Sequence, residues 1–279
     1  MPATDHAHTL LRIQQLIDEM AAAGGDSEPF ADQLRQRGLP HISFSQIKSI
    51  EFCEAEYTWK YILYRQPHPM PAYFAKGKLL HQAIAASYAA LAGQPAQDPT
   101  SLIAGATLEE QHRRHLINAL ATHRQNLWQG MRVLAIEHPF VFSLAGDLPP
   151  VVGVIDLVLQ DEDGLILVDH KTGRAFAEQD ELQLAIYRHY ASQAWQQPRV
   201  RFFYDHYRWV ENLKTIRKPA LYRQEVALPQ AGLASTLDRL PQAAQRIEAL
   251  KQRAAKPGFA PRREGQCFMC AYRSLCYGG

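Results

Sequence analysis

Two runs of apolar and β-branched residues, 151–159 and 165–168, are separated by a short Asp-Gly turn. This pattern predicts two strands joined as a hairpin. The hairpin carries unusual charges: Asp156 interrupts the first run, and Asp169 and Lys171 follow the second. Because side chains alternate along a strand, Asp169 and Lys171 point the same way, and Asp156 can lie near them. If the two strands pair, the three charged groups converge at one edge of the sheet.

Two carboxylates and an ammonium group at one sheet edge repel or lose hydration unless a cation joins them. Hard ions such as Mg²⁺ or Mn²⁺ prefer these oxygen ligands. Such an ion makes hydroxide near neutral pH and neutralises charge on a phosphate, while a lysine can orient or deprotonate the attacking water. A single buried aspartate is about as often a turn cap or ion-pair partner. Asp156, Asp169 and Lys171 together predict a centre for phosphodiester hydrolysis.

Two further residues are candidates for the metal shell. His81 lies on a helix predicted from Gly77 to about residue 91, whose small residues would let it approach the sheet closely. A neutral imidazole there could complete the shell, although a lone histidine is more often packed or exposed. Glu137, in a strand predicted over 132–143, is a weaker candidate for a metal or supporting role.

A helix predicted over 178–194 follows the charged hairpin. Its Gln183 and Tyr187 are four residues apart, so they share one helical face and can reach the same groove. Their amide and phenol groups could hold a phosphate or the lysine. Taken alone, the pair is weak evidence for a functional site, since a tyrosine at helical spacing usually belongs to a core.

The remaining pattern and the composition indicate a single α/β domain with a helical appendage. Further helices are predicted over 6–23 (ending at Gly24-Gly25), 28–37, 46–64, 107–129 and 229–254, and further strands at 199–209 and 221–227. We divide the chain into an N-terminal appendage, 1–40, and a main domain, 41–279. The net charge of +2 permits a nucleic-acid partner without requiring one. No apolar stretch of membrane length and no secretory pattern is evident, so a cytoplasmic protein is expected.

Four cysteines are unevenly placed. Cys53 stands alone, and Cys267, Cys270 and Cys276 crowd the end of the sequence. In a reducing compartment such a set indicates metal or cluster binding rather than disulfides. Four thiolates suit zinc and a [4Fe–4S] cluster alike, and the spacing alone does not separate them. A zinc ribbon more often shows two Cys-x-x-Cys pairs, whereas here one ligand is remote.

These motifs follow one another in a recognisable order. They are Ser43-Phe44-Ser45, Cys53, Gly77 with His81, Gly153-Val154-Ile155-Asp156, Asp169-His170-Lys171, Gln183 with Tyr187, and the three C-terminal cysteines. The set resembles the RecB-like and Cas4-like branch of the PD-(D/E)XK nuclease superfamily, from about Ser43 to Cys276. One departure is His170, where an aromatic residue such as tyrosine is commoner. That position mainly lends its backbone, so activity is still expected.

The resemblance implies a restriction-endonuclease-like α/β fold, with a central mixed β-sheet flanked by helices. A helical N-terminal appendage and a C-terminal cysteine-rich clamp would be added to it. The implied ligands of Mg²⁺ or Mn²⁺ are His81, Asp156, Asp169 and the carbonyl of His170. The implied catalytic lysine and its supporting residues are Lys171, Gln183 and Tyr187. The implied ligands of a [4Fe–4S] cluster are Cys53, Cys267, Cys270 and Cys276.

The resemblance also implies a function. The implied protein is a metal-dependent DNA nuclease that acts as an exonuclease on single-stranded DNA or DNA ends. It would serve DNA repair, recombination or CRISPR adaptation. Other repair or adaptation proteins are expected partners beside DNA, and the oligomeric state stays open. An alternative is a DNA-binding or scaffold subunit that keeps the fold and cluster, although intact Asp156, Asp169 and Lys171 argue against it. A sequence-specific endonuclease is disfavoured because no base-reading insertion is evident.

Overall fold

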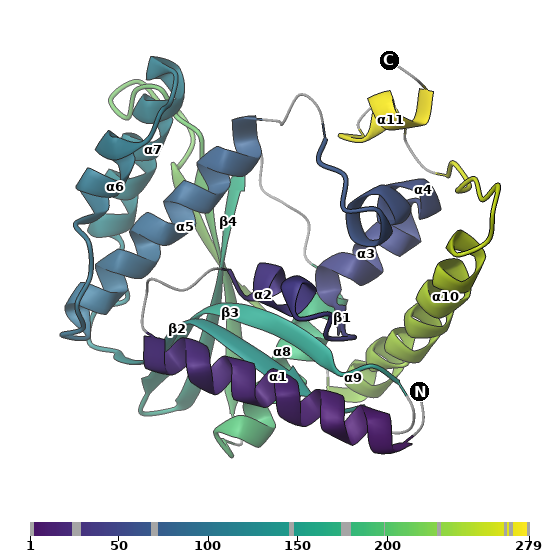
Figure 1. The fold of residues 1–279 in the computed structure, drawn as a ribbon. Helices are drawn as coiled ribbons and strands as arrows, with labels where there is room; N and C mark the ends of the chain where they lie inside the picture. The colour runs from purple at the N-terminus through teal and green to yellow at the C-terminus, as the bar shows by residue number, and fades with distance from the viewer. Residues whose placement is uncertain are drawn as a thin grey trace. The chain divides into compact units, whose positions relative to one another are not determined.

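Figure 1 shows the helices and strands of the computed structural model. The chain divides into two compact units. The first comprises Met1–Pro71, Pro139–Gly153 and Gln230–Gly279, and the second comprises Ala72–His138 and Val154–Pro229. The structure describes residues 3–23, 29–67, 72–144, 148–173, 180–197, 199–227, 230–264, 267 and 270–277. No helix in these ranges is both long and apolar enough to cross a membrane.

Among the described residues, the strands form a six-stranded mixed sheet. Its strands are β1 (Ile42–Ser43), β2 (Arg132–Phe142), β3 (Val151–Asp161), β4 (Gly164–Gly173), β5 (Val200–Arg208) and β6 (Leu221–Val226). The order is β1-β3-β4-β5-β6, and β2 also pairs with β3. β3 and β4 are antiparallel, β4 and β5 are parallel, and β5 and β6 are antiparallel. The predicted hairpin and the predicted restriction-endonuclease-like α/β fold are confirmed.

In the described part of the second unit, four helices accompany the strands. They are α5 (Ala72–Leu91), α6 (Pro99–Gly105), α7 (Glu110–Gln125) and α8 (Glu181–Ala194). The helix predicted over 107–129 corresponds to α7, which is shorter, whereas α6 was not predicted. Asp98 starts α6 by accepting a 2.7 Å hydrogen bond from the backbone N–H of Ser101. Proline at the first position of α6 is favourable, because its missing N–H has no partner there in any helix.

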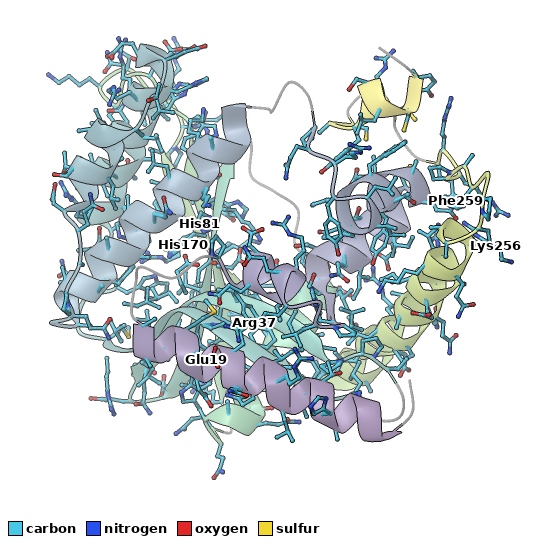
Figure 2. All side chains as sticks on the ribbon, viewed as in Figure 1. Glu19, Arg37, His81, His170, Lys256 and Phe259 are labelled. Carbon is cyan, nitrogen blue, oxygen red and sulfur yellow. The ribbon has the colours of Figure 1, made fainter. Side chains whose placement is uncertain are left out.

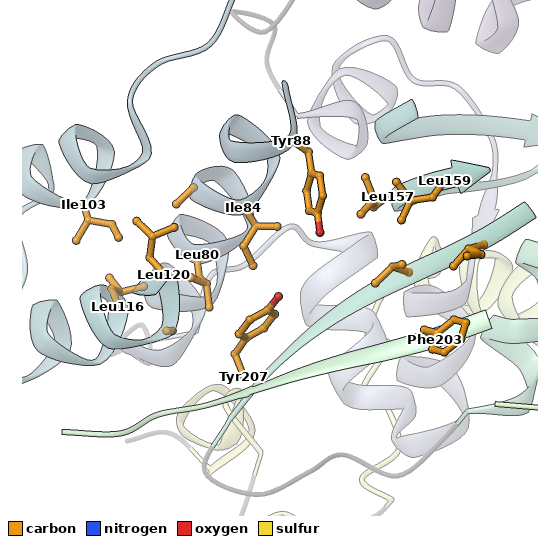
Figure 3. Packing of buried hydrophobic residues seen from close by; sticks show 14 residues of the cluster. Leu80, Ile84, Tyr88, Ile103, Leu116, Leu120, Leu157, Leu159, Phe203 and Tyr207 are labelled. Atoms are coloured by element: carbon orange, nitrogen blue, oxygen red, sulfur yellow. The ribbon is translucent and has the colours of Figure 1, made fainter. Parts of the chain in front are cut away.

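The core of the second unit lies between α5, α6, α7 and one face of the sheet (Figure 3). Leu80, Ile84 and Tyr88 of α5 pack there with Leu157 of β3 and Phe203 of β5. Residues of odd number in β5 therefore face this core. Even-numbered residues face α8 instead, as the ring contact of Phe202 with Tyr187 shows. The sheet is thus covered on both faces.

The first unit is mainly helical. Its helices are α1 (Ala3–Ala23), α2 (Phe30–Gln36), α3 (Phe44–Phe52), α4 (Glu54–Tyr57), the π-helical turn η2 (Thr58–Ile62), α9 (Gln230–Leu237), α10 (Arg239–Ala254) and α11 (Arg273–Tyr277). The helices predicted over 6–23 and 28–37 correspond to α1 and α2. The expected stop at Gly24-Gly25 lies outside the described residues. The helix predicted over 229–254 is interrupted between α9 and α10.

The helix predicted over 46–64 is also interrupted, for a reason that the structure shows. Ser43 caps α3 as expected, accepting a 3.3 Å hydrogen bond from Gln46. Cys53 then takes an extended conformation and ends α3. Its sulfur accepts a hydrogen bond from the backbone N–H of Glu264 at 3.4 Å. The N–H of Ala55 binds the carbonyl of Arg262 at 3.0 Å. These contacts with a remote segment replace helical hydrogen bonds at the break.

Candidate metal centre and catalytic residues

The charged residues of the hairpin meet in the second unit. Leu157 pairs with Val168 in the β3–β4 register, so Asp156 and Asp169 stand at the next position along the two strands. The backbone N–H of His170 donates a 2.7 Å hydrogen bond to Oδ2 of Asp156. This bond links the two strands at the point where their charged residues lie.

His81 reaches the same place from α5. Its Nδ1 lies 3.6 Å from Oδ2 of Asp156 and 4.0 Å from Oε1 of Glu137 in β2. Gly77 allows this approach, since a Cβ at that position would lie only 3.3 Å from Oγ1 of Thr172 in β4. The predicted close contact of the helix with the sheet is therefore present.

Lys171 forms a closed set of contacts with Asp169 and Gln183. Its Nζ lies 2.6 Å from Oδ2 of Asp169 and donates a 3.1 Å hydrogen bond to Oε1 of Gln183. Nε2 of Gln183 in turn donates to Oδ1 of Asp169 at 2.8 Å and to the hydroxyl of Tyr187 at 3.1 Å. The Tyr187 hydroxyl donates to the carbonyl of Val154 at 2.7 Å. Gln183 and Tyr187 thus hold the lysine–aspartate pair from α8.

His170 presents its ring to the opposite face of the sheet from its two neighbours. The ring lies 6.1 Å from that of His81, and both residues are labelled in Figure 2. It lies 6.3 Å from the ring of His123. Neither ring nitrogen has a hydrogen-bond partner among the described residues. Burial holds the pKa of His170 well below its usual value, so the ring is neutral. A metal contact through its carbonyl remains a prediction.

The carboxylates of this site titrate abnormally. Burial, with the nearby charge of Asp169, raises the pKa of Asp156 to about 6. Burial, with the charge of Asp156, raises that of Glu137 to about 7. For His81, burial lowers the pKa, but the surrounding carboxylates outweigh it and the net shift is upward. Burial opposes the charge of Lys171, but Asp169 raises its pKa overall. A bound cation would stabilise the ionised carboxylates.

These groups fit a divalent cation. One ligand atom each of His81, Glu137 and Asp156 lies within 4.8 Å of the other two. One imidazole and several carboxylates are a donor set that Mn²⁺ and Mg²⁺ accept. From the sequence alone, Glu137 is a weaker candidate ligand than His81 and Asp156. The feature that points to it is an acidic residue within an apolar strand. The structure places it beside His81.

The metal-free protein is expected to lose stability as the pH rises from about 4 to about 7. The pKa of Asp156 is higher in the folded state than in the unfolded chain, so the folded state binds more protons in this window. Raising the pH therefore removes up to about 3 kcal/mol through this group. His81, whose pKa is also raised, adds a loss above about pH 6.5.

Urea unfolding at several pH values, with a chelator present, measures this slope. Asp156→Asn should flatten it, and saturating Mn²⁺ should do the same in the wild type. An identical slope in the wild type and the Asn variant would contradict the assignment.

The four cysteines lie in the first unit as free thiols. Cys53 is buried, and the other three are half-buried. Burial raises the pKa of Cys270, and the nearby charges of Glu56, Cys53 and Cys276 act in the same direction. The backbone N–H of Cys270 binds the carbonyl of Cys267 at 3.2 Å. The remote cysteine and the C-terminal group are therefore brought together.

Two sulfur atoms in this group accept hydrogen bonds from N–H donors. Nε1 of Trp59 lies 3.2 Å from Sγ of Cys276, and the backbone N–H of Glu264 donates to Cys53. Two thiols of the group also donate, Cys53 to the carbonyl of Arg262 and Cys270 to Oε2 of Glu56.

Comparison with known proteins gives a family match and similar solved structures. The family described as the PD-(D/E)XK nuclease superfamily matches residues 41–277. A crystal structure from Eubacterium rectale, named "Putative exonuclease", is similar with a TM-score of 0.59 and 12% identity, over 91% of this chain and 94% of that one. At this identity the likeness is one of fold. The structure of SSO0001 has 11% identity over 95% and 94% of the two chains, but its TM-score of 0.36 supports no argument. No curated protein matches the chain.

Proposed function

Because the chain belongs to the PD-(D/E)XK nuclease superfamily, we propose that it hydrolyses DNA phosphodiester bonds with Mg²⁺ or Mn²⁺, as an exonuclease on single-stranded DNA or DNA ends. The observation that carries this proposal is the closed contact of Lys171 with Asp169 and Gln183 beside His81 and Asp156. The name of the Eubacterium rectale protein supports the exonuclease assignment.

The residues proposed to hold the cation are His81, Asp156, Asp169 and the carbonyl of His170. The bound cation would supply Lewis acidity and lower the pKa of water. Lys171 carries a raised pKa, so its ammonium group is charged near neutral pH and donates hydrogen bonds. It can therefore orient an attacking water and offset negative charge on the phosphate. Gln183 fixes the direction of that ammonium group, and Tyr187 fixes Gln183.

The second cofactor that we propose is a [4Fe–4S] cluster on Cys53, Cys267, Cys270 and Cys276. The N–H donors at two of the sulfur atoms support it. A zinc ribbon more often shows two Cys-x-x-Cys pairs, whereas here Cys53 is remote, and this pattern together with the family favours the cluster over zinc.

The domain boundaries that we propose are those predicted from the sequence. Residues 41–279 would form the nuclease domain with its clamp, and residues 1–40 an appendage; the family match from residue 41 supports this boundary. Within a cell the enzyme would act in DNA repair, recombination or CRISPR adaptation, with proteins of those systems as partners.

The test of the proposed function compares linear and circular single-stranded DNA. Purified protein is incubated with Mn²⁺ and either 5′-labelled linear DNA or a closed circle. We expect the linear strand to be degraded and the circle to persist, and a chelator or Asp156→Asn to stop degradation. Cleavage of the circle would contradict the exonuclease. Tight DNA binding without any cleavage would favour the scaffold alternative.

A further inference from the structure

Two exposed tyrosines of the first unit lie next to arginines. Among the described residues, Tyr64 and Tyr277 are the most exposed tyrosines, at 53% and 56%. The guanidinium group of Arg35 lies 5.6 Å from the ring centre of Tyr64. That of Arg263 lies 4.7 Å from the ring centre of Tyr277. Asp32 pairs with Arg35 at 3.0 Å and so helps to hold it there. Neither ring is buried in a core, and each has a positive charge beside it.

The two rings lie on segments that contact each other. Nε1 of Trp59 in η2 donates a 3.2 Å hydrogen bond to Sγ of Cys276 in α11. Tyr277 is the next residue of α11, and Tyr64 lies two residues beyond the end of η2. We call Tyr64, Tyr277 and the two arginines over them the tyrosine–arginine surface. It is formed by parts of the chain that are more than 200 residues apart.

An irregular backbone leaves Tyr64 exposed. The N–H of Leu63 binds the carbonyl of Thr58 at 2.9 Å, which is the bond of a π-helical turn rather than of an α-helix. Tyr64 then has a φ of +49°, in the left-handed region that residues other than glycine rarely adopt. π-Helical turns are rare and often lie at functional sites. An aromatic ring that is presented to solvent in this way is available to a ligand.

We infer that the tyrosine–arginine surface binds single-stranded DNA by stacking of its bases on Tyr64 and Tyr277; this inference rests on the proposed function. Every base has a flat face that can stack on an exposed ring, and a neighbouring arginine adds cation–π attraction. A duplex keeps the faces of its bases stacked on one another, so the exposed rings fit a single strand.

The charges of this surface fit a polyanion. Arg65 follows Tyr64 directly and is exposed, as is Arg263. In the part of the chain that the structure describes, neither Arg65 nor Arg263 pairs with a carboxylate. An apolar protein partner would leave these charges without a counter-charge, whereas the phosphates of a DNA strand supply one. Rings and cations together therefore favour a nucleic acid over a protein.

The test measures the Kd of the full-length protein for a labelled single-stranded oligonucleotide by fluorescence anisotropy, with a chelator present to prevent cleavage. Tyr64→Ala should raise the Kd by about 5–150-fold, the range for losing one stacked base, and Tyr277→Ala should act in the same direction. Tyr64→Phe keeps a ring that can stack and should bind like the wild type. Tyr222→Ala, which removes a 41% exposed tyrosine of the second unit, is the control and should leave the Kd unchanged.

An abasic oligonucleotide of the same length separates stacking from a structural role. It keeps the phosphates but offers no base, so the wild type and Tyr64→Ala should bind it equally. If Tyr64→Ala weakened binding of the abasic strand as much as that of the normal strand, base stacking on Tyr64 would be excluded.

Failure of this inference is distinguishable from failure of the proposed function. Wild-type affinity in both alanine variants would remove the stacking surface and leave the proposed nuclease intact. Absence of binding to single-stranded DNA by the wild type would remove the proposed substrate, and this inference with it. Tyrosine-dependent binding without cleavage in Mn²⁺ would keep the inference and contradict the nuclease.

Discussion

Lys171→Met is expected to lower the rate of DNA cleavage by about 10²–10⁴-fold, the range for losing a positioned charged group. Methionine keeps most of the apolar stem and removes the ammonium group that meets Asp169 and Gln183. The loss should appear in kcat, because the charge acts on the water and on the phosphate in the transition state. Single-turnover degradation of labelled single-stranded DNA with Mn²⁺ measures it.

Lys218→Met is the matched control, because Lys218 is an exposed lysine of the same unit, on the connection between β5 and β6. It should leave kcat unchanged. Mn²⁺ binding should persist in Lys171→Met, since the lysine is not a ligand. Cleavage by Lys171→Met at the wild-type rate would exclude the lysine from catalysis and contradict the proposed mechanism.

Cys270→Ala is expected to lose the cluster and to destabilise the first unit before it affects the metal centre. The cluster would join Cys53 to cysteines more than 200 residues later. Closing a loop of that length restricts the unfolded chain by about 5 kcal/mol in the chain-entropy view. The free energy of cluster binding by the four cysteines further stabilises the folded state. We expect a melting temperature lowered by roughly 10–20 °C and weaker DNA binding.

Absorbance and metal content report on the cluster itself. The wild-type protein should be brown, with broad absorbance near roughly 400 nm, and should contain iron and sulfide rather than zinc. Arg273→Ala, an exposed change in the same short helix α11, is the control and should keep both colour and stability. Unchanged thermal stability in Cys270→Ala would refute the clamp, and a colourless zinc protein would refute the cluster.

Sequence pattern was sufficient to predict those structural features that depend only on residues close together in the chain. The alternation of Asp169 and Lys171 along one strand placed them on one face, and a helical spacing of four placed Gln183 with Tyr187. The Asp-Gly turn predicted the β3–β4 hairpin, and the β-branched runs predicted the sheet. Each of these follows from backbone geometry over a few residues.

Breaks in the helices depended on remote contacts. Nothing in the apolar stripe of residues 46–64 reveals that Cys53 leaves the helix. The segment 262–264, some 200 residues away, supplies the hydrogen bonds that make the extended conformation favourable there. Helical propensity is weak by comparison, so tertiary contacts override it.

By itself the sequence predicted the sheet and the shared faces of Asp169 with Lys171 and of Gln183 with Tyr187, because strand alternation and helical spacing are set within a few residues. Only the tertiary structure decided that Glu137 joins His81 and Asp156, and that Cys53 meets the C-terminal cysteines. Both depend on how distant strands and helices pack, and a backbone conformation such as the positive φ of Glu137 leaves no mark in residue pattern.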